Sequence, residues 1–130
     1  MEQRDYILRE IEKIGMILQK IISRLFGKSG TASVQDSKHL EETAMDLQEL
    51  ADFHLAGFIQ MNRQDAIRYL ESQEGFNLKN IEDFSLILEK LGFTDKALWL
   101  LEYCRMKDKT YSFERENRIA TLQSRIKEPR

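Results

Sequence analysis

Residues 81–106, IEDFSLILEKLGFTDKALWLLEYCRM, contain two helical patterns separated by a turn at residues 91–94. In the first pattern the apolar residues recur at spacings of three and four, which predicts one apolar stripe along a helix. The second pattern has apolar residues on two faces, so we expect that helix to be covered from two sides. The apolar positions are Ile81, Phe84, Leu88 and Leu91 in the first pattern, and Ala97, Leu101 and Cys104 with Trp99, Tyr103 and Met106 in the second.

Gly92 marks the turn between these two helices. Glycine adopts the left-handed backbone conformation easily, and it is common just after the last residue of a helix. Thr94 or Asp95 can then accept hydrogen bonds from the free N–H groups that begin the next helix. The pattern therefore predicts two helices folded back on each other.

The length of 130 residues and a composition of 42% hydrophobic and 32% charged residues are typical of one folded soluble domain. The single cysteine cannot form an internal disulfide, and charged residues crowd the N-terminus where a secretory signal would begin. Lys13, Lys20 and Arg24 interrupt the best candidate for a membrane-spanning run. We therefore expect a cytoplasmic protein.

The formal net charge of −2 conceals an uneven distribution. Residues 1–28 carry six positive and four negative side chains, residues 36–104 carry six and fourteen, and residues 105–130 carry eight and four. The first interpretation is that the basic ends lie against the acidic middle or face solvent. The second is a basic surface for an anionic partner.

Residues 5–26 carry the most regular helical pattern, a heptad seam with apolar residues at alternating spacings of four and three. Further apolar residues broaden this seam beyond what one neighbouring helix covers, so we expect the helix to self-associate, most simply as a two-fold homodimer. Burial against the chain's own helices remains open, and Gly15 suggests close approach of another backbone. The seam is Ile7, Ile11, Ile14, Leu18, Ile21 and Leu25, flanked by Leu8, Ile17, Ile22 and Phe26.

A membrane interface is a second environment in which the apolar surface of the N-terminal helix could be buried. Residues 13–28 hold four positive and no negative side chains, so the helix could lie in a membrane interface. An interfacial helix needs a broad polar face, whereas the apolar residues here nearly encircle the helix. We therefore favour protein burial over membrane docking.

The rest of the chain divides into a linker and a helical domain. Residues 27–35, GKSGTASVQ, are small and polar and predict a linker between the N-terminal amphipathic helix, residues 1–26, and a helical-hairpin domain, residues 36–130. In that domain we expect helices at 38–61, 63–73, 80–91 and 95–106, with Asn62 and either Asn77 or Asn80 as caps. A last helix starts at Ser112 and uses Phe113, Ile119, Leu122 and Ile126 as its apolar face. No strand pattern is present, so the predicted class is all-α.

The segment LEKLGFTDKALWLLEYC, residues 88–104, resembles a tetratricopeptide repeat. Ser85 falls at the small position of the first helix, Gly92 at the turn, and Ala97, Leu101 and Cys104 at the packing positions of the second. The pattern Ala66, Leu70 and Glu71 recurs as Ala97, Leu101 and Glu102, displaced by 31 residues, which indicates a weak internal repeat.

This resemblance implies antiparallel helix pairs stacked as a short tetratricopeptide-like solenoid that binds proteins or peptides. The N-terminal segment RDYILREIEKIG resembles the opening of an uncharacterised bacterial family of small helical proteins, which implies no mechanism.

Residues able to support catalysis or metal binding are few. His39 and His54 lack the Glu-x-x-His spacing of a helical metal site, and Cys104 shares a face with apolar residues, as an inert buried thiol does. The Gly27-Lys-Ser sequence lacks the earlier glycine and preceding strand of a phosphate-binding loop. We therefore expect no enzymatic activity and no catalytic, cofactor or metal site. A deep polar cleft gathering Asp52, His54 and Cys104 would revive an enzymatic interpretation.

The basic and aromatic residues after position 104 are interrupted by Glu114 and Glu116, so we do not expect nucleic-acid binding. The predicted function is a non-enzymatic protein–protein interaction or scaffolding module with an unknown protein or peptide partner. The alternatives are a peripheral membrane protein and, less favoured, a small enzyme or nucleic-acid binder.

Overall fold

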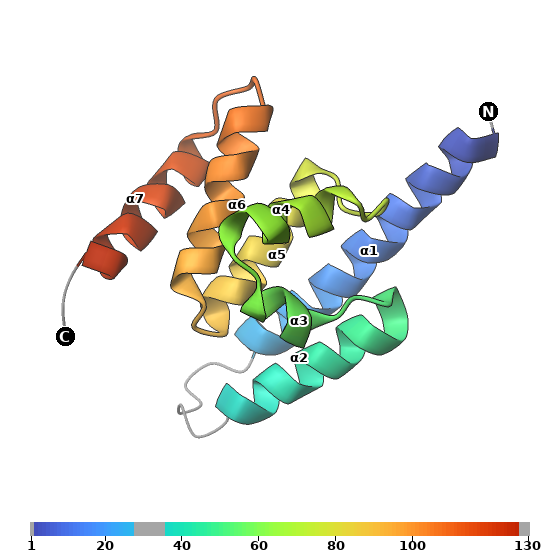
Figure 1. Cartoon of the computed structure of the whole chain (residues 1–130), viewed down its shortest axis with the longest axis horizontal. Coiled ribbons are helices and arrows are strands. Elements are labelled where there is room, and N and C mark those ends of the chain that lie inside the picture. The colour runs from blue at the N-terminus through green and yellow to red at the C-terminus, as the bar shows by residue number, and fades with distance from the viewer. Residues whose placement is uncertain (1, 28–35, 128–130) are drawn as a thin grey trace.

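The computed structural model describes residues 2–27 and 36–127, and these residues form seven helices and no strand. The all-α prediction is confirmed for this part of the chain. The predicted linker, residues 27–35, lies outside the described residues except for Gly27, which ends the first helix. The helices are α1 (Glu2–Gly27), α2 (Asp36–Ala51), α3 (Leu55–Gln60), α4 (Arg63–Glu71), α5 (Leu78–Lys90), α6 (Thr94–Lys107) and α7 (Phe113–Lys127) (Figure 1).

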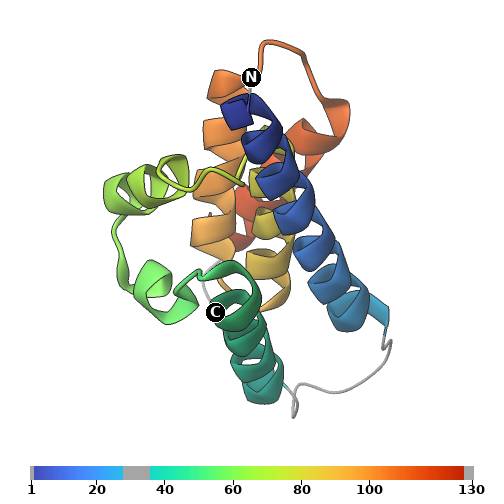
Figure 2. The same cartoon turned by 90° about the vertical axis from the view of Figure 1, so that its right-hand side faces the viewer.

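Helix α5 is the centre of the fold. It packs against α6 and α1, while α6 also contacts α7 and α4, and α1 also contacts α2 (Figures 1 and 2). Phe84, Ile87 and Leu88 of α5 are fully buried in one hydrophobic core to which α1 and α6 also contribute. In α6 the predicted face of Ala97, Leu101 and Cys104 is fully buried. The expected cover of the second face is wrong in part, because Trp99 and Tyr103 are half-buried and Met106 is 72% exposed.

Helix α1 contributes four members of its predicted seam to that core. Ile14, Leu18, Ile21 and Leu25 are all buried within the single chain, so they are available to a second copy only if α1 leaves this position. Ile11 is half-buried and Ile7 is 38% exposed. The N-terminal end of the seam, Ile7 and Ile11, is therefore the part that remains accessible on a single chain.

The contact between α1 and the start of α5 depends on two glycines and one asparagine. A Cβ atom at Gly75 would lie 2.3 Å from Cγ1 of Ile14 and 2.9 Å from the carbonyl oxygen of Glu10. The buried Asn80 amide donates hydrogen bonds to the carbonyl oxygens of Ile11 (3.0 Å) and Gly75 (2.7 Å). Its Oδ1 would lie 3.2 Å from a Cβ atom at Gly15. The close approach expected at Gly15 is thus made by a side chain.

The single helix predicted for residues 38–61 is wrong, because the chain breaks between α2 and α3. Asp52 adopts a left-handed conformation with φ of 52°, which aspartate tolerates better than most residues. A continuous helix advances about 100° per residue and would place Phe53 about 200° from Ala51, on the opposite side. With the break, Phe53 is fully buried in an aromatic cluster formed by Phe53, Phe58, Tyr69, Phe76 and Phe84.

The local end signals of the other helices mostly succeed. Gly92 has φ of 98°, its N–H bonds to the Glu89 carbonyl, and the Phe93 N–H bonds to the Leu88 carbonyl, the pattern of a Schellman cap. Asn62 and Asn77 cap α4 and α5 as predicted. For α6 the N-cap is Phe93, which makes no side-chain cap, although Asp95 accepts from the Lys96 N–H.

Helix α7 corrects the predicted apolar face of the last helix. Ser112 accepts a hydrogen bond from the Arg115 N–H, and Ile119 and Leu122 are buried as expected. Phe113 and Ile126, however, are 70% and 48% exposed, and the buried residue at the start of the helix is Arg115. The side of α7 that faces the core is short in apolar residues and rich in arginine.

Candidate interaction surfaces

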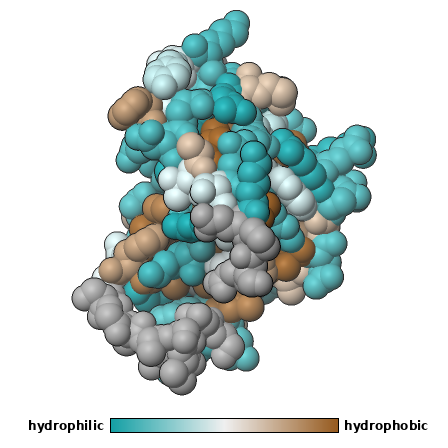
Figure 3. Space-filling view, turned by 90° about the vertical axis from the view of Figure 1, so that its left-hand side faces the viewer, coloured by the Kyte–Doolittle hydropathy of each residue, from teal (hydrophilic) through white to brown (hydrophobic). Residues whose placement is uncertain are grey.

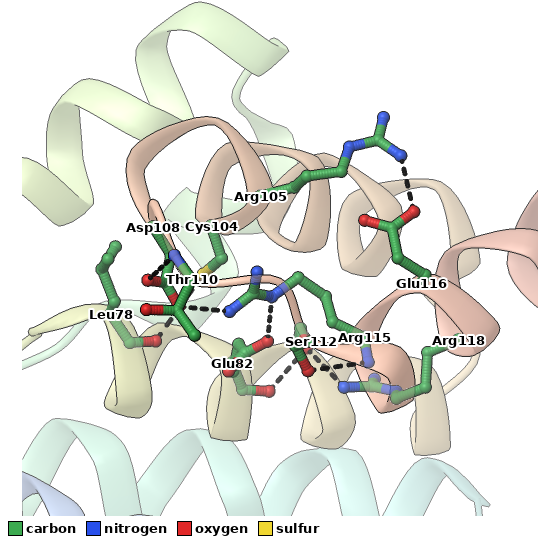
Figure 4. Close-up of polar contacts among 11 residues, drawn as sticks. Leu78, Glu82, Cys104, Arg105, Asp108, Thr110, Ser112, Arg115, Glu116 and Arg118 are labelled. Carbon is green, nitrogen blue, oxygen red and sulfur yellow. Dashed lines mark hydrogen bonds and ion pairs between the residues drawn. The ribbon is translucent and has the colours of Figure 1, made fainter.

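The basic C-terminal helix lies against the acidic part of the chain. Arg115 contacts Glu82 at 2.6 Å and Asp108 at 2.7 Å (Figure 4). Arg118 contacts Glu89 at 2.9 Å. Arg125 also reaches Glu89, and Arg105 pairs with Glu116. Four of the basic residues weighed as an anion-binding surface are therefore used within the chain. The face on which α7 lies shows hydrophilic residues interspersed with hydrophobic ones (Figure 3).

The pKa values of Asp108 and Arg115 are both shifted by the contacts of this cluster. The backbone N–H of Thr110 and the Arg115 guanidinium hydrogen-bond the Asp108 carboxylate and hold its pKa below the usual range. Burial alone would lower the pKa of Arg115, but hydrogen bonds to Glu82 and Asp108 outweigh burial and raise it. Both groups are charged near neutral pH, so the cluster holds α7 electrostatically.

The residues considered for catalysis do not come together. Asp52 and His54 are 3.9 Å apart and both are exposed, at the edge of an open pocket of about 440 Å³ that Cys104 does not line. Cys104 is buried on α6, where its Sγ lies 3.6 Å from the Leu78 carbonyl oxygen. Burial and the nearby Glu82 charge raise the pKa of the Cys104 thiol to about 12, which disfavours the reactive thiolate. Residues 2–27 and 36–127 contain no cluster of three or more histidine, cysteine or acidic side chains able to hold a metal ion.

A groove of about 510 Å³ lies between α4 and α6. Its apolar part consists of Ile67, Tyr103 and Met106, of which Met106 is 72% exposed. Charged and polar residues surround these side chains: Arg63, Gln64, Arg68, Glu71, Glu102 and Lys107. The groove combines an apolar floor with charged edges, as protein-binding surfaces do.

Both segments of the predicted 31-residue repeat contribute a residue to this groove. Ala66 and Leu70 on α4 and Ala97 and Leu101 on α6 are buried beneath it, while the last member of each copy, Glu71 or Glu102, lines it. The repeat was the only sequence signal that pointed to this place. It did not identify Ile67, Arg68 or Met106, because their shared location depends on how α4 packs on α6.

Polar contacts across the groove hold its two acidic residues. The Tyr103 hydroxyl donates to Glu71 at 2.9 Å, and Arg63 contacts Glu102 at 2.9 Å. Burial and the hydrogen bond to Glu71 raise the pKa of Tyr103 to about 12, so its hydroxyl stays protonated at neutral pH. The Lys107 ammonium lies 5.8 Å from the centre of the Tyr103 ring. Arg68 makes no ion pair within the described ranges.

A second surface is the N-terminal end of α1, which extends beyond the body of the molecule (Figure 1). Tyr6, Ile7 and Leu8 are 52%, 38% and 53% exposed. Because successive residues of a helix lie about 100° apart, these three side chains together expose apolar surface over about 200° of the helix circumference, and we call this surface the α1 patch.

Neither surface is identified by likeness to a known protein. No protein-family model matches the chain, and the searches of curated proteins and of solved structures also found no match. Among the described helices, none combines the length and apolar character needed to cross a membrane. The proposed function is therefore based on the groove between α4 and α6 and on the N-terminal end of α1.

Proposed function

We propose that this chain is a non-catalytic protein–protein interaction or scaffolding module that self-associates through its N-terminal helix. The observation that carries this proposal is the exposed patch of Tyr6, Ile7 and Leu8 on the projecting end of α1. Ile11, half-buried one turn further along, continues the patch toward the core. The proposed dimer therefore uses the open end of the predicted seam, while Ile14 and the later members hold α1 on its own chain.

The charges around the patch favour a second copy as its partner. Residues 4–13 carry three positive side chains, Arg4, Arg9 and Lys13, and three negative ones, Asp5, Glu10 and Glu12. In an antiparallel two-fold pairing centred on Ile7, Arg4 of one copy lies opposite Glu10 of the other and Asp5 lies opposite Arg9, so opposite charges meet. A segment of balanced charge is self-complementary in this arrangement.

The scaffold that presents these surfaces is proposed to be a short tetratricopeptide-like stack of antiparallel helix pairs. Three observations support this: the contact of α5 with α6 across the Gly92 turn, the contact of α4 with α6, and the burial of Ala97, Leu101 and Cys104. The small residue Ser85 is also fully buried on α5, where the repeat pattern expects a small side chain.

Sedimentation equilibrium on three proteins tests the self-association. We expect the wild type to be dimeric, the double variant Ile7→Glu with Leu8→Glu to be monomeric, and Met16→Glu to remain dimeric. Met16 is 73% exposed on the same helix outside the patch, so this variant tests whether one negative charge added elsewhere on α1 is enough to prevent the dimer. Because all three side chains are exposed, the variants should keep wild-type helicity in circular dichroism.

A wild type that stays monomeric at the highest soluble concentration would refute the dimer. The membrane alternative predicts a different result, a monomer that sediments with vesicles of anionic phospholipid and is released by salt. Adding such vesicles to the wild type therefore distinguishes dimerisation from membrane binding as the way in which the exposed residues of α1 are buried.

A further inference from the structure

We infer that the groove between α4 and α6 binds an acidic amphipathic helix of a partner protein. This inference rests on the proposed role as an interaction module and names the chemistry of its partner. The groove is distinct from the α1 patch, so one chain would carry one surface for its own copy and another for a different protein.

The apolar part of the groove is suited to a side chain inserted from outside. Ile67 and Tyr103 are half-buried and Met106 is 72% exposed, so the chain itself leaves this floor uncovered. A volume of about 510 Å³ accommodates more than one apolar side chain. Methionine is flexible and polarisable, so Met106 can adjust to the shape of the inserted residue.

The charged residues that line the groove favour a partner with negative charge. Residues 36–104 carry only six positive side chains against fourteen negative ones, yet two of the six, Arg63 and Arg68, line this groove together with Lys107. The acidic residues of the groove are already engaged, Glu71 by the Tyr103 hydroxyl and Glu102 by Arg63. Arg68 and Lys107 therefore present positive charge at its edge, and carboxylates on a partner complement them.

The form of the groove indicates a helix as the occupant. It runs between two helices and is open to solvent, and its lining combines apolar side chains with the cations Arg63, Arg68 and Lys107. A helix with apolar residues at spacings of three and four fills such a floor with one face and places carboxylates on the flanks of that face. A fully enclosed cavity would instead have favoured a small ligand.

Fluorescence anisotropy with two labelled synthetic peptides tests this inference on the full-length chain. One peptide is a short amphipathic helix of leucine and methionine with glutamate at the remaining positions, and the matched peptide has lysine in place of glutamate. We expect the acidic peptide to bind at least about tenfold more tightly than the basic one. The double variant Arg68→Glu with Lys107→Glu should reverse this preference.

The control variant is Lys20→Glu with Lys38→Glu, which changes the net charge equally at exposed positions that do not line the groove. It should keep the preference of the wild type for the acidic peptide. Equal binding of the two peptides, or an unchanged preference in the Arg68 and Lys107 variant, would overturn the inference. Binding of decanoate without binding of the acidic peptide would do the same, because it would show a site for small anionic ligands.

The peptide titration is independent of the dimer measurement. A wild type that dimerises but binds neither peptide would remove the groove inference and leave the proposed self-association standing. A monomeric wild type that binds the acidic peptide with the expected charge preference would refute the proposed self-association and support the groove inference.

Discussion

Helix α1 packs against α5 and helix α7 packs against α6, but the two helices are attached by different forces. α1 buries four large aliphatic residues and approaches so closely that Gly75 has no room for a side chain. α7 buries Ile119 and Leu122 and uses Arg115 and Arg118 to reach carboxylates on α5 and, at Asp108, in the connection between α6 and α7. One flank is held by apolar packing and the other largely by charge.

The difference shows that the hydrophobic pattern and the charge distribution of a sequence predict two kinds of contact, which respond to different perturbations. Apolar contacts of the α1 kind depend on shape and respond strongly to changes of volume. Ion pairs of the α7 kind respond to pH, and their partly exposed partners limit their contribution to stability. The two flanks should therefore fail under different perturbations, and the following experiments separate them.

The largest expected effect is that of Leu18→Ala on the α1 flank. Leu18 is fully buried, so the change removes apolar contacts and leaves a cavity, and we expect a loss of about 2–5 kcal/mol in the free energy of unfolding. Urea unfolding followed by circular dichroism measures it. Met16→Ala, at a 73% exposed site on the same helix, should change stability by less than about 0.5 kcal/mol. Equal effects of the two would contradict the described packing of α1.

Gly75→Ala should produce the next largest effect. The added Cβ would lie 2.3 Å from Ile14 and 2.9 Å from the backbone of Glu10, and the overpacking should cost about 1–3 kcal/mol. Gly57→Ala is the matched control, because its Cβ would meet only His54 at 4.0 Å within α3. That variant should keep stability or raise it by up to about 1 kcal/mol. Urea unfolding of both variants shows whether α1 and the start of α5 are as close as described.

On the α7 flank, Arg115→Met should cost about 1–2 kcal/mol, less than the Leu18 change. The variant keeps much of the side-chain volume but leaves Glu82 and Asp108 without their shared cation, and both carboxylates are partly exposed to water. Thermal unfolding of the variant and the wild type gives the difference. A loss as large as that of Leu18→Ala would show that charge holds the fold as strongly as apolar packing does.

The smallest expected effect is a dependence of stability on acid pH through Asp108. The folded pKa of Asp108 is lowered relative to its unfolded value, so its stabilising effect is complete above the unfolded pKa of about 3.9 and is lost as the pH falls through the folded pKa. Urea unfolding across the acid range should show a shallower loss of stability in Asp108→Asn than in the wild type. Identical pH profiles would mean that the Thr110 N–H and Arg115 do not lower the pKa of Asp108 in solution.

Local sequence signals were sufficient for most helix ends and for the helical class. Gly92, Asn62, Asn77 and Ser112 each act within their own turn of backbone, so the sequence pattern contains all that their roles require. The break at Asp52 could not be predicted in this way. It depends on Phe53 meeting Phe76 and Phe84, which are distant in the sequence.

The same limit applies to the surfaces. Arg115 belongs to the basic C-terminal stretch, for which contact with the acidic middle, exposure to solvent and a basic binding surface were all predicted as alternatives. Nothing near Arg115 in the sequence reveals Glu82, which lies 33 residues away. The periodicity of α1 identified its buried residues correctly as apolar but could not show which neighbour covers them. The groove was missed because Arg68 and Met106 come from different helices, and only the 31-residue repeat connected those helices.

The placement of the aromatic rings gives the chain two separate optical reporters. Its one tryptophan, Trp99, lies on α6 with the Lys96 ammonium 5.2 Å from the ring centre, and it takes no part in the five-ring cluster. Indole fluorescence therefore follows the surroundings of α6, whereas ellipticity in the near ultraviolet includes the packed rings of α3, α4 and α5. An opening that separates Phe53 from Phe76 and Phe84 would change the ellipticity, whereas a change around Trp99 would change the indole emission.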